Sequence, residues 1–174
     1  MIISDGNLTY DVKAFPNKQE GQRYFDRQVC NCKVKLSDTY GDVLSVVSSK
    51  SSLTQKTIFS VAFESDIPAG ASYCLVSDSL DRWILQVDNR LFFVQPSAGR
   101  LVAIQEISTP LSSLYLWNHR IIVLEEARVR IANINGDILQ SVNTDLIEDV
   151  KLVDSQLFIE TIEGNRVVVD LAKG

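Results

Sequence analysis

Histidine, methionine and cysteine are scarce in this chain of 174 residues, which has one histidine, one methionine and three cysteines. A single histidine, His119, leaves little material for Ser-His-Asp or Cys-His catalysis, and no nucleophile motif accompanies it. Zinc requires about four ligands, which Cys30, Cys32, Cys74 and His119 do not offer in a recognisable spacing. We interpret Cys30 and Cys32 as small core residues. The odd cysteine count predicts a reducing, cytoplasmic compartment, and the sequence predicts no metal and no cofactor.

Long apolar runs and glycine-rich loops are also absent. No run approaches the roughly 20 apolar residues of a membrane-spanning helix, and the first residues lack the basic region and apolar core of a secretory signal. The 8 glycines are isolated, without the spacing of a phosphate-binding loop. The net charge is −5, and residues 143–174 carry 3 basic against 7 acidic residues. Because no apolar run is long enough to span a bilayer, we expect no membrane partner, and because acidic segments repel phosphate backbones, we expect no nucleic-acid partner.

Branched apolar residues are abundant: valine and isoleucine number 34, against 9 alanines. Branched side chains lose rotamer freedom in helices and pack well on pleated sheets. The composition, 45% hydrophobic and 22% charged, is typical of one globular domain. We therefore predict a single all-β domain over residues 1–174, built of antiparallel sheets, with a β-sandwich or barrel as the alternative to stacked repeats.

A repeated pattern fills the second half of the chain. Its three copies begin at Ile84, Leu114 and Val150. Each copy has an apolar strand, a two-residue polar turn, a second apolar strand, and an arginine that leads into a third strand. The turns are Asp88-Asn89, Asn118-His119 and Asp154-Ser155, and the arginines are Arg100, Arg130 and Arg166. Aspartate and asparagine tolerate the positive φ that such turns need. The middle copy adds a hairpin at Asn135-Gly136.

Several of these strands are apolar without alternation, namely 91–94, 121–124 and 167–169. Continuous apolar strands predict burial on both faces, as in sheets stacked between other sheets. The pattern over residues 80–174 resembles the blades of a β-propeller, in architecture only and without the signature of any particular family. The resemblance implies stacked four-stranded sheets and carries over no functional residue. Because 174 residues suit only the smallest ring, an open stack, a ring completed by the N-terminal residues, and a sheet covered by a partner all remain open.

Residues 1–80 form a less regular β portion in this interpretation. We predict a hairpin of residues 1–4 and 7–12 around Asp5-Gly6, and a short helix near 16–28 that Gly21 weakens. Residues 29–36 alternate as in a half-buried strand. Two further strands are expected at 43–47 and 57–63. The serine-rich segment 48–56 between them is expected to be a mobile loop.

The candidate site residues are Asp81, Arg82 and Trp83, just before the first repeat, with Tyr115 and Trp117 in the second. The favoured function is a non-catalytic protein-binding or scaffold module, with self-association as a companion hypothesis because an incomplete stack leaves a sheet face or edge exposed. A carbohydrate or small-ligand site at the tryptophans is the first alternative. A hydrolase using Asp78 or Asp81 as acid or base is the second, and an inhibitor that presents the acidic segment 145–163 to a basic protein is the third.

Overall fold

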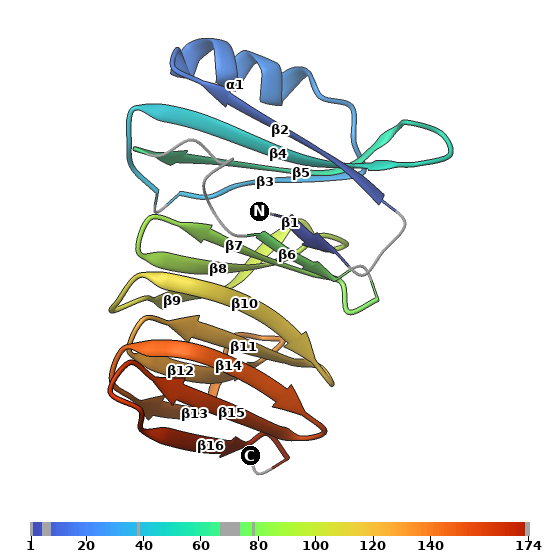
Figure 1. Ribbon diagram of the computed structural model, residues 1–174. Coiled ribbons are helices and arrows are strands. Elements are labelled where there is room, and N and C mark those ends of the chain that lie inside the picture. Colours follow the sequence, from blue (N-terminus) through green and yellow to red (C-terminus); the bar gives the residue numbers. More distant parts are fainter. Residues whose placement is uncertain (1, 5–7, 38, 67–73, 78, 173–174) are drawn as a thin grey trace. The chain divides into compact units, whose positions relative to one another are not determined.

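The structure, a computed structural model, describes residues 2–4, 8–37, 39–66, 74–77 and 79–172. These residues form strands arranged in four sheets, together with one helix (Figure 1). The prediction of an all-β protein with mostly antiparallel sheets is therefore confirmed. The chain divides into two compact units, residues 1–105 and 106–174. Each unit contains two sheets and has its own hydrophobic core.

Sheet I belongs to the first unit and has the strand order β2-β4-β5-β3. Its strands are β2 (Leu8–Phe15), β3 (Cys32–Lys35), β4 (Val43–Ser51) and β5 (Thr57–Ser65). Strands β2, β4 and β5 are antiparallel, whereas β3 joins β5 in parallel. The predicted alternation around β3 is confirmed, because Val34 and Leu36 are buried and Lys33 and Lys35 are exposed.

Helix α1 (Lys18–Arg27) packs on sheet I (Figure 1). The side chain of Asn17 caps its N-terminus by accepting hydrogen bonds from the backbone N–H groups of Gln19 and Glu20, at 3.1 and 3.2 Å. Gly21 does not break the helix. A Cβ atom there would lie 2.8 Å from Leu44 Cδ2, so glycine permits the close approach of helix and sheet.

Sheet II, also in the first unit, has the order β1-β6-β7-β8-β9. Its strands are β1 (Ile2–Ser4), β6 (Cys74–Ser77), β7 (Arg82–Val87), β8 (Arg90–Gln95) and β9 (Arg100–Glu106). The predicted N-terminal hairpin is wrong: β1 pairs in parallel with β6, whereas β2 pairs with β4 of sheet I. Pairing with partners distant in sequence outweighs the local turn signal at Asp5-Gly6, which lies outside the described residues.

The core of the first unit lies between sheets I and II. It contains the following buried residues: Val34, Leu36, Val47, Phe59, Val61 and Phe63 from or beside sheet I, and Val76, Trp83, Leu85, Val87, Phe92 and Val94 from sheet II. Burying each large apolar side chain contributes about 1.5–3 kcal/mol.

The predicted mobile loop 48–56 is shorter than expected, because β4 continues to Ser51. Ser48 is buried, and its Oγ lies 2.8 Å from Ser60 Oγ on the neighbouring strand β5. Gln28 Nε2 donates to Ser48 Oγ at 3.1 Å. Hydrogen bonding satisfies these buried hydroxyl groups, so serine-rich sequence can continue the strand.

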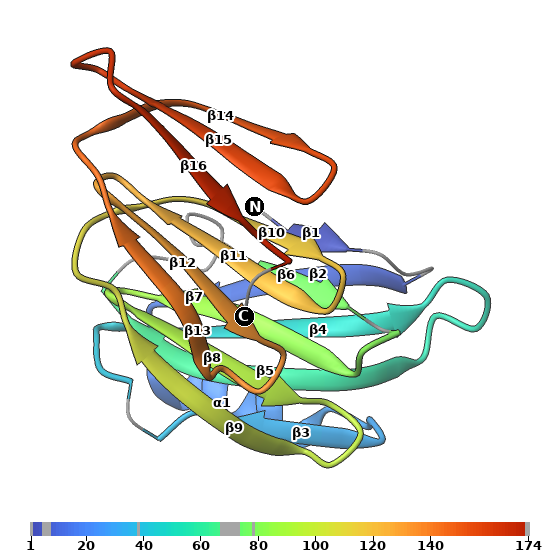
Figure 2. The same cartoon turned by 90° about the horizontal axis from the view of Figure 1, so that it is seen from below.

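The second unit contains sheet III, of order β10-β11-β12-β13, and sheet IV, of order β14-β15-β16. Sheet III comprises β10 (Leu111–Trp117), β11 (Arg120–Glu125), β12 (Arg128–Asn133) and β13 (Ile138–Asn143). Sheet IV comprises β14 (Ile147–Val153), β15 (Gln156–Thr161) and β16 (Arg166–Asp170) (Figure 2). The core of the second unit lies between these two sheets. It contains Ile122, Leu124, Val129 and Ile131 of sheet III and Leu157, Ile159 and Val169 of sheet IV.

The predicted turns are confirmed in both units. Val87 pairs with Arg90, Trp117 with Arg120, and Val153 with Gln156, so each turn has two residues. Asp88, Asn118 and Asp154 have φ values of 50°, 43° and 52°, in the region that their side chains tolerate. The hairpin at Asn135-Gly136 joins β12 to β13, with Gly136 at φ 88°.

The copies of the repeat occupy two different places in their sheets. The second and third copies supply the first three strands of sheets III and IV, whereas the first copy supplies β7, β8 and β9, the last three strands of sheet II. Two strands, β1 and β6, thus precede the first copy in its sheet, whereas no strand precedes the second and third copies in theirs. Short apolar strands joined by tight turns align equally well in either place, because the pattern specifies hairpins and not sheet edges.

Helix α1 has 10 residues. No helix in the described residues has the length and apolar character required to cross a membrane.

Candidate functional site

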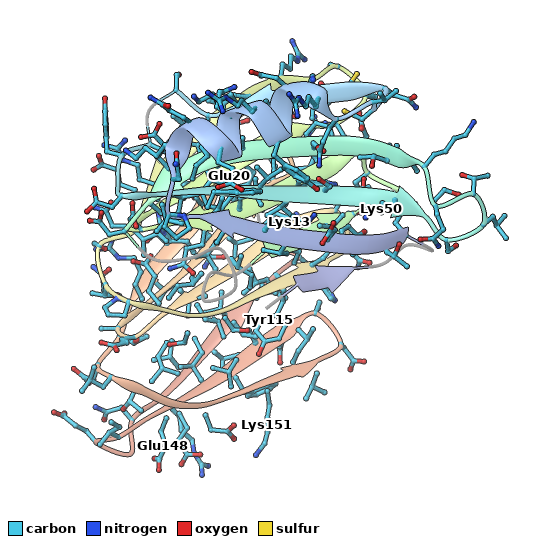
Figure 3. All side chains as sticks on the ribbon, turned by 90° about the horizontal axis from the view of Figure 1, so that it is seen from above. Lys13, Glu20, Lys50, Tyr115, Glu148 and Lys151 are labelled. Atoms are coloured by element: carbon cyan, nitrogen blue, oxygen red, sulfur yellow. The ribbon has the colours of Figure 1, made fainter. Side chains whose placement is uncertain are left out.

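One face of sheet IV packs on sheet III, and the opposite face, here called the outer face, does not. Because cross-strand partners share a face of a sheet, the register places three rows of residues there. The rows are Asp149-Glu160-Arg166, Lys151-Phe158-Val168 and Val153-Gln156-Asp170. Figure 3 shows Lys151 projecting from β14. The outer face thus has an apolar middle between charged residues.

The apolar residues of the outer face are accessible to solvent. Val153, Phe158 and Val168 are 53%, 40% and 52% exposed. The prediction that segment 167–169 is buried on both faces is therefore wrong, although it is correct for 91–94 and 121–124. The difference arises because the described part of the second unit contains no further sheet against the outer face.

Ion pairs of both signs flank these apolar side chains. Lys151 Nζ lies 3.0 Å from Asp149 Oδ2, and Arg166 Nη2 lies 3.5 Å from Glu160 Oε1. The hydrogen bond and charge of Lys151 hold the pKa of Asp149 below its ordinary value. The same residues line a shallow hollow of about 320 Å³ that also includes Phe158. An exposed apolar patch with a polar rim is typical of an interaction surface.

The first unit contains a second hollow, of about 490 Å³, at one end of sheets I and II. Its lining includes Phe59, Trp83, Asp81, Ser97 and Cys32. The structure therefore brings two of the predicted site residues, Asp81 and Trp83, to one hollow. Asp78, the other carboxylate of the hydrolase hypothesis, lies outside the described residues.

Asp81 organises the turn that begins β7. Its carboxylate accepts hydrogen bonds from Gln95 Nε2 at 3.0 Å, from Ser97 N at 2.9 Å and from Ser97 Oγ. Partial burial raises the pKa of Asp81, but the bonds from Ser97 and Gln95 outweigh it and leave the pKa below its ordinary value. A carboxylate held ionised in this way suits a structural turn better than a general acid.

Arg82 and Trp83 have the surroundings of structural residues. Arg82 is buried and its Nη1 donates to the carbonyl oxygen of Asp81 at 2.8 Å. Trp83 is 1% exposed, and its ring meets Phe59 edge-on at 4.8 Å between centroids. Stacking on a sugar requires an exposed ring face, which Trp83 does not offer.

Tyr115 and Trp117 lie on β10, in the second unit. Trp117 is partly buried and packs against the core between sheets III and IV. Tyr115 is 46% exposed, and Figure 3 marks its place on the strand. The five predicted site residues are therefore divided between the two units.

The remaining candidates have mainly structural surroundings. Cys32 Sγ donates a weak hydrogen bond to the carbonyl oxygen of Ser97 at 3.5 Å. Partial burial raises the pKa of Cys30, despite the charge of Lys33 nearby. His119 has φ 64° in the predicted turn. Within the described ranges, no three His, Cys, Asp or Glu residues are grouped as metal ligands.

None of the residues predicted as site residues lies on the outer face of sheet IV. A signal was present in residues 149–160, where Lys151 and Glu160 interrupt apolar strands at positions that share a face with Phe158. Charged residues of this kind are rare on a covered face and predict exposure.

No protein-family model matches the chain, and no curated protein sequence matches it. Solved structures do resemble it. The computationally designed Ika4 protein superposes with a TM-score of 0.55 at 9% identity, over 83% of this chain and 98% of Ika4. AztD from Citrobacter koseri gives 0.52 at 13%, over 81% and 43% of the two chains. BamB from Moraxella catarrhalis gives 0.50 at 16%, over 76% and 42%.

The structural neighbours are propeller proteins, and the four small sheets have the form of propeller blades. The chain therefore has a β-propeller-type fold, as the repeat predicts. It spans almost the whole of Ika4 but less than half of AztD and BamB. At these identities the likeness concerns the fold alone.

Proposed function

We propose that the protein is a non-catalytic binding module, and that a partner protein docks on the outer face of sheet IV. The observation that supports this most directly is the exposure of Phe158, Val153 and Val168 in the middle of that face. Apolar sheet faces are normally covered, so this one is suited to a partner. Repeat architectures commonly present extended surfaces to partners.

The charges around the patch define the chemistry of the partner. Lys151 and Arg166 stand beside Asp149 and Glu160, so the rim carries both signs in similar measure. A complementary partner surface has an apolar centre and a rim of alternating charge. A purely basic or purely acidic partner would leave half of these charges opposed to like charges.

The experiment compares two substitutions at strand residues of equal exposure. Phe158 is 40% exposed on the outer face, and Leu139 is 39% exposed on β13 of sheet III. Phe158→Glu places a charge in the apolar middle, whereas the matched control Leu139→Glu places it elsewhere. Tagged wild-type and variant chains are expressed in the cells that make the protein, and captured proteins are quantified by mass spectrometry.

We expect a set of partner proteins that wild type and Leu139→Glu capture in equal amounts. Phe158→Glu should capture about ten-fold less of these proteins or lower still, since burying a charge opposite an apolar surface is costly. Circular dichroism and thermal unfolding verify that both variants fold. Equal capture by all three chains, or depletion by Leu139→Glu as well, contradicts docking on this face.

Binding of a small polar ligand in the hollow of the first unit is a second candidate function. The supporting observation is its volume of about 490 Å³ beside Asp81 and Trp83. Ser97 is exposed at the rim, so Ser97→Trp would obstruct the opening. A sugar or metabolite that raises the melting temperature of wild type but not of Ser97→Trp supports this function, and a panel without any shift opposes it.

We also propose that the protein is located in the cytoplasm.

A further inference from the structure

Strand β16 forms an edge of sheet IV. Sheet IV has three strands, whereas sheet III has four, and β13 covers the corresponding edge of β12. Among the described residues, no strand pairs with the outer edge of β16. Figure 2 shows β14, β15 and β16 side by side with β16 last. An edge strand directs hydrogen-bonding groups outward and is a template for another strand.

The hydrogen bonds at the two ends of β16 determine which residues face that edge. Leu171 N donates to Ser155 O at 2.7 Å, and Thr161 N donates to Asn165 O at 3.0 Å. Hydrogen-bonded and non-hydrogen-bonded pairs alternate along antiparallel strands. Val167 and Val169 therefore bond to β15, whereas Arg166, Val168 and Asp170 direct their backbone N–H and C=O groups toward the outer edge.

The sequence of β16, Arg-Val-Val-Val-Asp, is complementary to itself in the antiparallel direction. When a second copy lies alongside with Val168 opposite Val168, Arg166 stands opposite the partner's Asp170 at both ends. In this register, the residues that pair across the two copies are Arg166, Val168 and Asp170. These are the residues whose backbone N–H and C=O groups point toward the outer edge. Backbone hydrogen bonding, apolar contact and opposite charge thus require the same register.

We propose that two copies of this chain associate edge to edge through β16, about a twofold axis at Val168, to form one continuous sheet. The interface is isologous, as in most homodimers. The outer face stays uncovered and its row of Phe158 and Val168 continues into the partner. The proposal is independent of docking on the outer face. Because one short strand buries little surface, we expect a dissociation constant of about 10 μM to 1 mM.

Charge reversal at the ends of β16 provides the main test. Arg166→Asp alone and Asp170→Arg alone each place like charges opposite each other at both ends of the dimer. The double variant Arg166→Asp/Asp170→Arg restores opposite charges with the direction exchanged. A mixture of the two single variants also restores them, because one chain then carries two carboxylates and the other two guanidinium groups.

Sedimentation velocity over a concentration series measures the association. We expect wild type and the double variant to dimerise, each single variant to have a dissociation constant raised about ten-fold or more, and the mixture to recover dimer. Wild type that stays monomeric up to about 3 mM overturns the proposal. Single variants that dimerise like wild type overturn it as well.

A second measurement uses the unaltered chain and does not depend on how variants fold. In the monomer the amides of Val167 and Val169 are protected by β15, whereas that of Val168 is open at the edge. We expect hydrogen exchange at Val168, followed by NMR, to slow at least ten-fold as the concentration rises, with Val167 and Val169 changing less. Concentration-independent exchange at Val168 overturns the proposal. Phe158→Glu leaves the edge intact, so loss of docking and loss of dimer are separable.

Discussion

Sheets III and IV are formed by copies of the same sequence pattern, but their surroundings differ. Both begin with an apolar strand, a two-residue turn and a second apolar strand. In sheet III the strand β11 is buried on both faces, as Ile121 and Ile122 show, whereas in sheet IV Leu157 is buried and Phe158 is exposed. The local sequence pattern determines that a hairpin forms, but the neighbouring sheets determine which faces of that hairpin are buried.

The ion pairs of the two sheets differ in the same way. Arg130 Nε lies 2.7 Å from Glu125 Oε1, with side chains only 5% and 0% exposed. Glu125 Oε2 also accepts hydrogen bonds from the backbone N–H groups of Ser108 and Thr109, at 2.9 and 3.1 Å. The Arg166–Glu160 pair of sheet IV is largely solvated. One pair is therefore part of a buried network, and the other is a direct contact on the solvent-exposed surface.

Removing the arginine from each pair gives the largest expected contrast. Arg130→Leu leaves Glu125 buried without its counter-charge, which costs about 3 kcal/mol or more of unfolding free energy. Arg166→Leu should change the unfolding free energy by less than about 0.5 kcal/mol, because exposed pairs contribute little. Urea denaturation of both variants measures the difference. Equal effects would mean that burial does not distinguish the two pairs.

Truncating an apolar side chain at matched places in the two second strands gives the next largest contrast. Ile122 and Phe158 each occupy the third position of the strand that follows the turn. Ile122→Ala should cost about 2–4 kcal/mol, because the residue is 1% exposed. Phe158→Ala should cost less than about 1 kcal/mol, despite the larger side chain. Thermal unfolding compares them, and a large loss for Phe158→Ala would show that the outer face is covered in solution.

Most of the fold could be predicted from local signals. Asp88, Asn118 and Asp154 specify tight turns because their side chains tolerate positive φ. The signals failed where distant residues decide. The pairing of β1 with β6 replaces a local hairpin, and Ser48 is buried in a strand because Ser60 and Gln28 satisfy its hydroxyl group.

The candidate site could be predicted less well, because exposure depends on neighbours that the sequence does not specify. Trp83, a large aromatic residue beside charged residues in the sequence, has the features of a binding residue, yet it is a core residue. The two valines that flank Val168 predict that it is covered, yet it is exposed. Residue type alone therefore does not separate core from binding surface, and alternation with charged cross-strand partners such as Lys151 is the better guide.

The turns of sheets II and IV differ too, and here the expected effect of substitution is smallest. Asp81 and Asp154 both have positive φ, 53° and 52°, and asparagine tolerates this conformation equally. The carboxylate of Asp81 accepts three hydrogen bonds from Gln95 and Ser97, so Asp81→Asn should cost about 1 kcal/mol at neutral pH. Asp154→Asn is the matched control and should cost almost nothing.

The dependence on pH distinguishes charge from conformation. Folding lowers the pKa of Asp81, so its ionised form is stabilised in the native state. This contribution is fully present above the ordinary pKa of about 3.9 and is lost as the pH falls through the lower native value. The gap in unfolding free energy between wild type and Asp81→Asn should therefore be constant from pH 7 to about 5 and should narrow below about 4. A gap that persists unchanged at acidic pH would assign the role of Asp81 to the shape of the turn, as in Asp154, and not to its charge.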